Sequence, residues 1–145
     1  MEAREQITAH GDPAVLGHHP TTFEVTTHRH LTATGDCIIA IAADKGAMDL
    51  SPHFRSILQC PGATLTTTLT CGEEVAVVHA QGSPLLSLDH PTDLVWRRSS
   101  FTCGRTIAIC ADTTAATLPR PLIATLKRGA DLEVDLLAVS PDQGT

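Results

Sequence analysis

The sequence predicts a mainly β protein, specifically an internally duplicated β-sandwich or barrel with two short helices and a pseudo-two-fold axis. Several short segments have the apolar alternation or the continuous apolar runs that are typical of strands. Only two segments have helical spacing, and two short helices cannot cover both faces of a sheet with this many strands. Blocks of the sequence also recur in the same order, which favours a duplicated unit.

Three blocks of sequence occur twice in the same order along the chain. Residues 39–44 (IAIAAD) return as 107–112 (IAICAD), His-Pro-Thr at 19–21 returns at 90–92, and Gly-Ala at 62–63 returns at 129–130. The offset changes by only a few residues between blocks, as expected when the differences fall in loops. We therefore predict one domain over residues 1–145, containing an internal repeat at about 18–80 and about 89–140.

The first repeat contains two predicted strands followed by a short helix. Residues 21–27 (TTFEVTT) alternate apolar and polar side chains, which predicts a strand with one wet face. Residues 37–43 (CIIAIAA) are continuously apolar, which predicts a strand buried on both faces. A Ser-Pro pair at 51–52 then favours the start of a helix, because serine caps the first turn and proline fits its first position.

The remaining segments predict a second helix and three more strands. The helix at about 121–128 is followed by Gly129, a typical left-handed helix terminator. Residues 64–70 and 132–139 predict corresponding strands of the two repeats, and residues 74–80 predict one more. The last of these forms a hairpin with 64–70. For the whole duplicated fold we expect eight or more strands.

The composition predicts a soluble protein of the cytoplasm. Hydrophobic residues make up 42% of the 145 positions, no apolar run is long enough to span a membrane, and the first residues, MEARE, lack the apolar stretch of a signal peptide. The five cysteines are an odd number without a CxxC pair, which favours free thiols. We therefore expect a protein that is not embedded in a membrane and has no disulfides.

The charge balance argues against nucleic acid as a partner. The net charge is −6, with only ten lysines and arginines, whereas nucleic-acid affinity rests on neutralising phosphates. Aromatic residues make up only 3% of the chain, so base-stacking surfaces are also scarce. The one basic segment beside an aromatic residue is Trp96-Arg97-Arg98, which keeps RNA contact as a minor alternative.

Polar residues present in only one repeat are candidates for function, whereas residues shared by both repeats are candidates for holding the unit together. In the alignment of the two repeats, Asp36 and Cys37 correspond to Arg105 and Thr106, and Lys45 corresponds to Thr113. We therefore assign Asp36, Cys37 and Lys45 as candidate catalytic residues. Each also has an ordinary interpretation, as a turn aspartate, a buried thiol and a solvated lysine.

Histidines and acids near the predicted loops suggest a divalent-metal site. His10, His18 and Asp36 are the candidate ligands, with Glu24 as a further one, although their spacing matches no established metal motif. Asp44 and His19 are candidate ligand-binding residues. Because both recur in the second repeat, a structural role is the alternative: Asp44 could bond backbone N–H groups of the following loop, and His19 a backbone carbonyl.

Two long stretches resemble the signature of an archaeal family catalogued as domain of unknown function 371. They are residues 18–26 (HHPTTFEVT), followed by Leu-Thr at 31–32, and residues 35–45 (GDCIIAIAADK). The resemblance runs over nearly the whole chain and implies a mainly β, sandwich-type fold in an archaeal-type cytosolic protein. It implies no activity and no catalytic residue. Asp12 departs from the histidine of the family pattern, which weakens a metal site there.

These observations support two main hypotheses about function. The first is a small-ligand or metal-dependent enzyme or binding protein, with its site on the first-repeat loops. The second is a non-catalytic interaction module that binds a partner protein through an exposed sheet edge or the Trp96 strand. The sequence leaves open the substrate, the cofactor, the oligomeric state and whether the protein is an enzyme.

Overall fold

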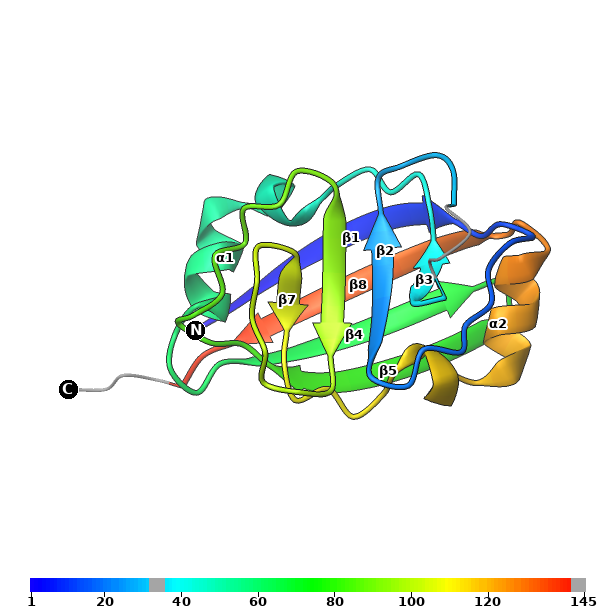
Figure 1. Ribbon diagram of the computed structural model, residues 1–145. Helices are drawn as coiled ribbons and strands as arrows, with labels where there is room; N and C mark the ends of the chain where they lie inside the picture. Colours follow the sequence, from blue (N-terminus) through cyan, green and yellow to red (C-terminus); the bar gives the residue numbers. More distant parts are fainter. Residues whose placement is uncertain (32–35, 142–145) are drawn as a thin grey trace.

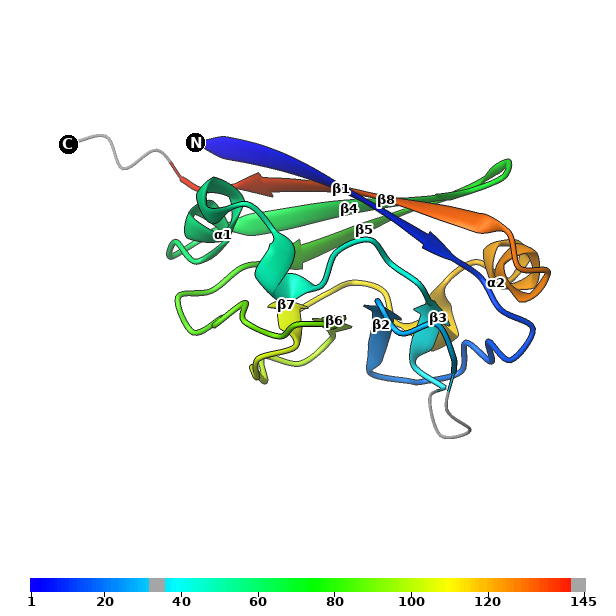
Figure 2. The same cartoon turned by 90° about the horizontal axis from the view of Figure 1, so that it is seen from above.

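The computed structural model describes residues 1–31 and 36–141 and confirms the predicted mainly β fold. Eight strands form two four-stranded sheets, which face each other as separate layers and do not close into a barrel (Figures 1 and 2). Two short helices lie at opposite ends of the sandwich. Of the two predicted alternatives, the structure therefore selects the sandwich.

The first layer, which we call sheet A, is entirely antiparallel. Its strands lie in the order β1-β8-β4-β5, with bounds Glu2–His10, Asp131–Val139, Thr64–Cys71 and Glu74–Gln81. Buried and exposed residues alternate along β4, β5 and β8, so one face of the sheet packs on the core and the other faces solvent. The predicted hairpin of β4 and β5 is confirmed.

The second layer, sheet B, has a central antiparallel pair with a parallel strand on each side. Its strands lie in the order β3-β2-β6-β7, with bounds Ile38–Ala40, Thr22–Thr26, Asp93–Arg97 and Thr106–Ala108. Both central strands are almost completely buried, even at polar positions. The polar side chains of these two strands are therefore removed from water, which is costly unless they have hydrogen-bonding partners.

The helices begin where the sequence predicts. Helix α1 spans Pro52–Leu58, and the Ser51 side chain accepts a hydrogen bond from the Phe54 backbone N–H. Helix α2 spans Arg120–Lys127 and ends at Gly129, which has a positive φ of 83°. Short 3-10 turns, η1 at Ala47–Asp49 and η2 at Ala115–Thr117, precede the two helices. Neither helix reaches the length and hydropathy that a membrane crossing requires in the described part of the chain.

The core lies between the two sheets and is anchored by aromatic stacking. Phe23 of β2 and Trp96 of β6 are paired across the strands, with ring centroids 4.5 Å apart and planes inclined by 13°. Both side chains are fully buried, as are Ile39 and Ile107 of the flanking strands. The indole N–H of Trp96 donates to the hydroxyl of Thr67 in sheet A at 2.8 Å, which links the two layers.

The order of elements occurs twice along the chain. Strands β1, β2 and β3, then η1, α1 and β4, are followed by β5, β6 and β7, then η2, α2 and β8. Exchanging the two sets leaves the strand order of each sheet unchanged when it is read from the opposite end. This is the arrangement that a pseudo-two-fold axis requires, but descent from one duplicated unit stays a prediction.

Three local expectations differ from the structure. The alternation in residues 21–27 predicted a strand with one wet face, but β2 is buried along its whole length. Strand β1 was not predicted, because its inward-facing positions include the charged Glu5 and so lack an apolar pattern. The predicted strand at residues 37–43 is shorter, since β3 covers only Ile38–Ala40. Ala42 has a positive φ of 54°, which is incompatible with an extended strand and turns the chain towards sheet A.

Candidate functional site

The strongest group of interacting ionisable side chains lies on the outer face of sheet B. Phe23 and Val25 belong to the core, and alternation along β2 places Glu24 and Thr26 on the opposite face. The connection between β6 and β7 extends on this side, away from sheet A (Figure 2). It carries Arg105 to the outer face, where the arginine contacts strands β2 and β6.

Glu24 is a buried carboxylate in the middle of this face. It is only 4% exposed, and its Oε1 atom accepts a hydrogen bond from Nη1 of Arg105 at 3.2 Å. Burial raises the pKa of Glu24 to about 7, and the neighbouring Asp93 carboxylate contributes in the same direction, while Arg105 opposes them. Glu24 therefore changes its protonation state near neutral pH.

Asp93 is the second acid of the cluster and behaves differently. Its Oδ1 atom accepts hydrogen bonds from the hydroxyls of Thr26 at 2.8 Å and Thr92 at 2.9 Å. Burial raises the pKa of Asp93, but these hydrogen bonds, with the charges around it, outweigh burial and hold the pKa below its ordinary value. The cluster thus combines an ionised aspartate with a glutamate that titrates near neutrality.

Arg105 joins the two acids and also reaches solvent. The same Nη1 atom lies 3.2 Å from Glu24 and 3.4 Å from Oδ2 of Asp93, yet 44% of the arginine side chain is exposed. The buried carboxylates fix the guanidinium on one side and leave its other side accessible. A guanidinium oriented in this way can bind an incoming carboxylate or phosphate group without first losing much side-chain freedom.

A second cation and a thiol lie beside this group. Arg97 donates from Nε to the hydroxyl of Thr106 at 2.8 Å and from Nη2 to Sγ of Cys103 at 3.4 Å. Burial raises the pKa of Cys103, but the Thr106 hydroxyl and the Arg97 guanidinium outweigh it and bring the pKa down to about 7. The Arg97 guanidinium also lies 5.0 Å from the ring centre of Phe101, which helps to orient it.

Cys37 and Asp36, two of the predicted catalytic residues, border the cluster from the β3 side. The carbonyl of Cys37 accepts a hydrogen bond from the Glu24 backbone N–H at 2.9 Å. Burial raises the pKa of the Cys37 thiol, and the Glu24 carboxylate raises it further, so thiolate is disfavoured. Asp36 lies in the turn before β3 and is half-buried. Its neighbour Gly35 lies outside the described residues.

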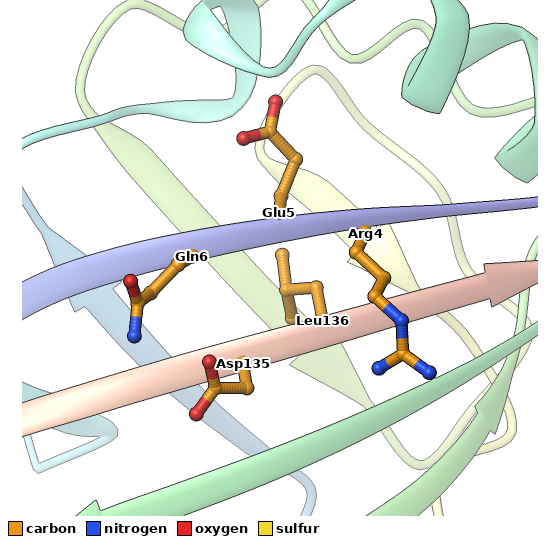
Figure 3. Close-up of a pocket in the computed structure, with 5 residues that line it drawn as sticks. All are labelled: Arg4, Glu5, Gln6, Asp135 and Leu136. Carbon is orange, nitrogen blue, oxygen red and sulfur yellow. The ribbon is translucent and has the colours of Figure 1, made fainter.

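Lys45, the third predicted catalytic residue, lies in another part of the molecule. Its Nζ atom donates to Oε1 of Glu5 and to the backbone carbonyl of Gln6, both at 2.9 Å. These β1 residues line a hollow on sheet A with three others, Arg4, Asp135 and Leu136 (Figure 3). Glu5 points away from Arg4 and Gln6, to the opposite side of β1. The lysine is thus placed against sheet A, whereas Cys37 contacts sheet B.

Asp44 and His19, the predicted ligand-binding residues, both accept hydrogen bonds from the backbone. Oδ1 of Asp44 accepts from the N–H of Thr8 in β1 at 3.0 Å, so its partner is a distant strand and not the following loop. Nδ1 of His19 accepts from the N–H of Thr22 at 3.2 Å, and does not donate to a carbonyl as the sequence analysis suggested. The corresponding residues Asp112 and His90 make equivalent bonds.

The structure does not bring the predicted metal ligands together. His10 pairs with Asp131 at the end of β1, His18 is exposed in the segment before β2, and Asp36 adjoins β3. Within residues 1–31 and 36–141, no three histidine, cysteine or acidic side chains are arranged to hold a metal ion. Glu24, the further metal candidate, is instead engaged by Arg105.

Sequence reasoning identified one side of the cluster and missed the other. It ranked Glu24 because the matching position in the second repeat is Val95, and it treated Arg105 only as the counterpart of Asp36. Asp93 and Cys103 were not selected at all. The available signal was their place in the second repeat: Asp93 begins β6, the strand that pairs with β2, and Cys103 lies in the connection after β6. Using this signal required knowing that β2 and β6 are neighbours.

Comparisons with known proteins agree with the resemblance noted in the sequence. The family described as a domain of unknown function, DUF371, matches residues 7–139. An uncharacterised protein of the archaeon Methanocaldococcus jannaschii is 36% identical over 126 residues, which cover 87% of this chain and 93% of that protein. The match includes both strands of the central pair in sheet B and the connection that carries Arg105. This chain therefore belongs to the DUF371 family.

Proposed function

We propose that this protein binds a small molecule with a carboxylate or phosphate group on the outer face of sheet B. Arg105 holds the anionic group, and Glu24 exchanges a proton with the bound molecule. The observation that carries the proposal is the contact between a buried acid that titrates near pH 7 and an arginine that is fixed on one side and exposed on the other. The same arrangement would serve a binding protein or an enzyme that uses acid–base chemistry.

The position opposite Glu24 argues that its carboxylate is not needed for folding. Glu24 pairs directly with Val95 across the central strands, and both side chains are buried on the same face of sheet B. Because β2 and β6 are equivalent strands of the two halves, Val95 occupies in β6 the place that Glu24 occupies in β2. The fold therefore accepts an uncharged valine at this place. Burying a carboxylate costs stability unless its partners offset the desolvation, so a buried acid that the fold can replace with valine is a candidate for function.

The two acids have different roles in the proposed site, because one stays ionised and the other can transfer a proton. Asp93 is held ionised by hydroxyl groups and keeps Arg105 oriented. Glu24 exchanges its proton near neutral pH, where a general acid or base is most effective. Arg97 adds a second positive charge at the same face, and Cys103 supplies a thiol that is partly ionised near pH 7. These groups favour an anionic ligand over a metal ion.

Binding of acetate and of inorganic phosphate tests this proposal. In a titration followed by 1H–15N correlation spectra, both anions are expected to shift the amide signals of Glu24, Asp93 and Arg105. An anion beside Arg105 favours the neutral form of Glu24, so binding is expected to be tighter one pH unit below the Glu24 pKa than one unit above it.

A matched pair of arginine variants supplies the control. R105Q removes the guanidinium of the cluster and is expected to abolish the localised shifts. R128Q removes an equal charge from the exposed end of α2 and is expected to leave them unchanged. Shifts that persist in R105Q, or that are spread over the surface and disappear equally in both variants, would contradict an anion site at Arg105.

The alternative, a protein interaction module, has one specific observation in its favour. Val75 and Val77 of β5 are 57% and 48% exposed at an edge of sheet A. This edge lies in the layer opposite the Glu24 cluster, so the two features do not compete for one surface. An interaction through β5 is therefore compatible with a ligand site on sheet B.

A further inference from the structure

The two edges of sheet A occupy corresponding places in the fold but differ chemically. Strand β1 forms one edge and β5 the other. The Thr8 N–H in β1 donates to Oδ1 of Asp44, and the Thr8 carbonyl accepts from the Asp44 backbone N–H. In β5, His79 makes the same two bonds with Asp112. Thr8 therefore corresponds to His79, and counting back along each strand aligns Arg4-Glu5-Gln6 with Val75-Ala76-Val77.

The β1 edge is protected against pairing with another strand. Glu5 is an inward-pointing charge, 11% exposed, that binds Lys45. The same lysine donates to the carbonyl of Gln6, which occupies an acceptor that an added strand would use. Charged side chains and covered backbone groups are common ways in which proteins block the edges of their sheets.

The β5 edge lacks each of these protections. Ala76 stands in place of Glu5, Val77 in place of Gln6, and Thr113 in place of Lys45. The hydroxyl of Thr113 donates to Asp112 and so does not act as the lysine does. The side chains that replace Arg4 and Gln6 are valines, and both are about half exposed. An exposed, apolar edge strand without protecting charges is a surface prepared for strand pairing.

The backbone at this edge is oriented to accept a strand. His79 directs its N–H and carbonyl away from β4, because both groups bond Asp112. In an antiparallel strand alternate residues point their backbone groups to the same side, so Val77 and Val75 also direct theirs outward. Residues 109–112 cover this side of β5 from His79 onwards. In the part of the chain that the structure describes, no strand pairs with the outer side of β5 at Val75 and Val77. Figure 1 shows β5 at the lower margin of sheet A.

We propose that the β5 edge binds a second copy of this chain, by antiparallel pairing of β5 with β5. This interaction is independent of the proposed ligand site on sheet B. It would join the two copies of sheet A into one continuous eight-stranded sheet, with each copy contributing four strands. A symmetric pair of edges is the simplest closed assembly that leaves neither β5 edge open.

The sequence of β5 is complementary to itself about Ala76. A two-fold axis at this residue places Val75 opposite Val77 of the second copy, and the reverse pair is generated by symmetry. Each of these pairs can exchange two backbone hydrogen bonds, and the four valines meet on one face. The pairing ends before His79, whose outward N–H and carbonyl already bond Asp112. This complementarity favours a second copy over an unrelated strand.

Sedimentation equilibrium of three proteins tests the proposal. Wild type is expected to have the mass of two chains across the micromolar range. V77K places a charge in the pairing surface and is expected to have the mass of one chain, whereas Q6K makes the matched change on β1 and is expected to remain a dimer. Circular dichroism and thermal unfolding establish that each variant is folded.

Amide hydrogen exchange supplies a second measurement that does not depend on a variant. The amides of Val75 and Val77 are expected to exchange slowly at high protein concentration and rapidly on dilution, because pairing protects them. A wild-type protein with the mass of one chain at every concentration would overturn the proposal. So would a V77K variant that remains a dimer, or fast exchange at Val75 and Val77 in a dimer formed elsewhere.

Discussion

Replacing Trp96 with alanine is expected to lower the free energy of unfolding by about 3 to 5 kcal/mol, the range for removing a large aromatic side chain from a core. Trp96 is fully buried and stacks on Phe23 at 4.5 Å. Its N–H also bonds Thr67 of the opposite sheet, which loses its partner in the variant. Chemical denaturation of both proteins measures the difference.

Two further variants separate the contributions at this position. W96F keeps an aromatic ring against Phe23 but removes the N–H donor, so it is expected to lose less stability than W96A. T67V removes the acceptor and is expected to resemble W96F. A loss below about 1 kcal/mol for W96A would mean that the two sheets do not depend on this contact, contrary to the fold described above.

The stability of the protein is expected to decrease as pH rises through the titration of Glu24. The pKa of this group is about 7 in the folded protein, compared with 4.5 as its ordinary value. Between these values the folded state holds a proton that the unfolded state has released, so unfolding becomes more favourable as pH increases. A shift of this size corresponds to a cost of about 3 kcal/mol, absent below pH 4.5 and complete above pH 7.

The E24Q variant isolates this effect from the other titrating groups. Glutamine resembles the protonated glutamate, so E24Q is expected to match wild type below pH 4.5, to become more stable than wild type as pH rises from 4.5 to 7, and to keep that advantage above pH 7. E133Q removes an exposed glutamate from β8 and is expected to keep the wild-type pH dependence. A difference between wild type and E24Q that does not change with pH would show that Glu24 titrates normally.

Local sequence signals predicted the elements in which apolar residues are buried and polar residues are exposed or cap a helix. The predicted strands at residues 64–70 and 132–139, the Ser-Pro start of α1 and the glycine after α2 all reappear in the structure. Strand β1 does not follow this pattern, because the charged Glu5 points inward, where it pairs with Lys45. Only a tertiary contact makes a charge acceptable at that position, and such a contact has no local sequence signal.

The candidate site was predicted in part because its two halves come from distant segments. Comparison of the repeats identified Glu24 and Cys37, since the second repeat has different residues at the matching positions. It located the site on first-repeat loops, whereas the described cluster also takes Asp93 and Arg105 from the second half. The antiparallel pairing of β2 with β6 brings these residues together, and the sequence did not specify that pairing.

The pKa of the Glu24 carboxyl group, measured by NMR titration with and without acetate, tests the proposed anion site most directly. We expect a value near 7 in the free protein and a higher value with acetate, because a bound anion at Arg105 further disfavours the ionised glutamate. A pKa near the ordinary value of 4.5 that acetate does not change would contradict both the buried environment of Glu24 and an anion site beside it.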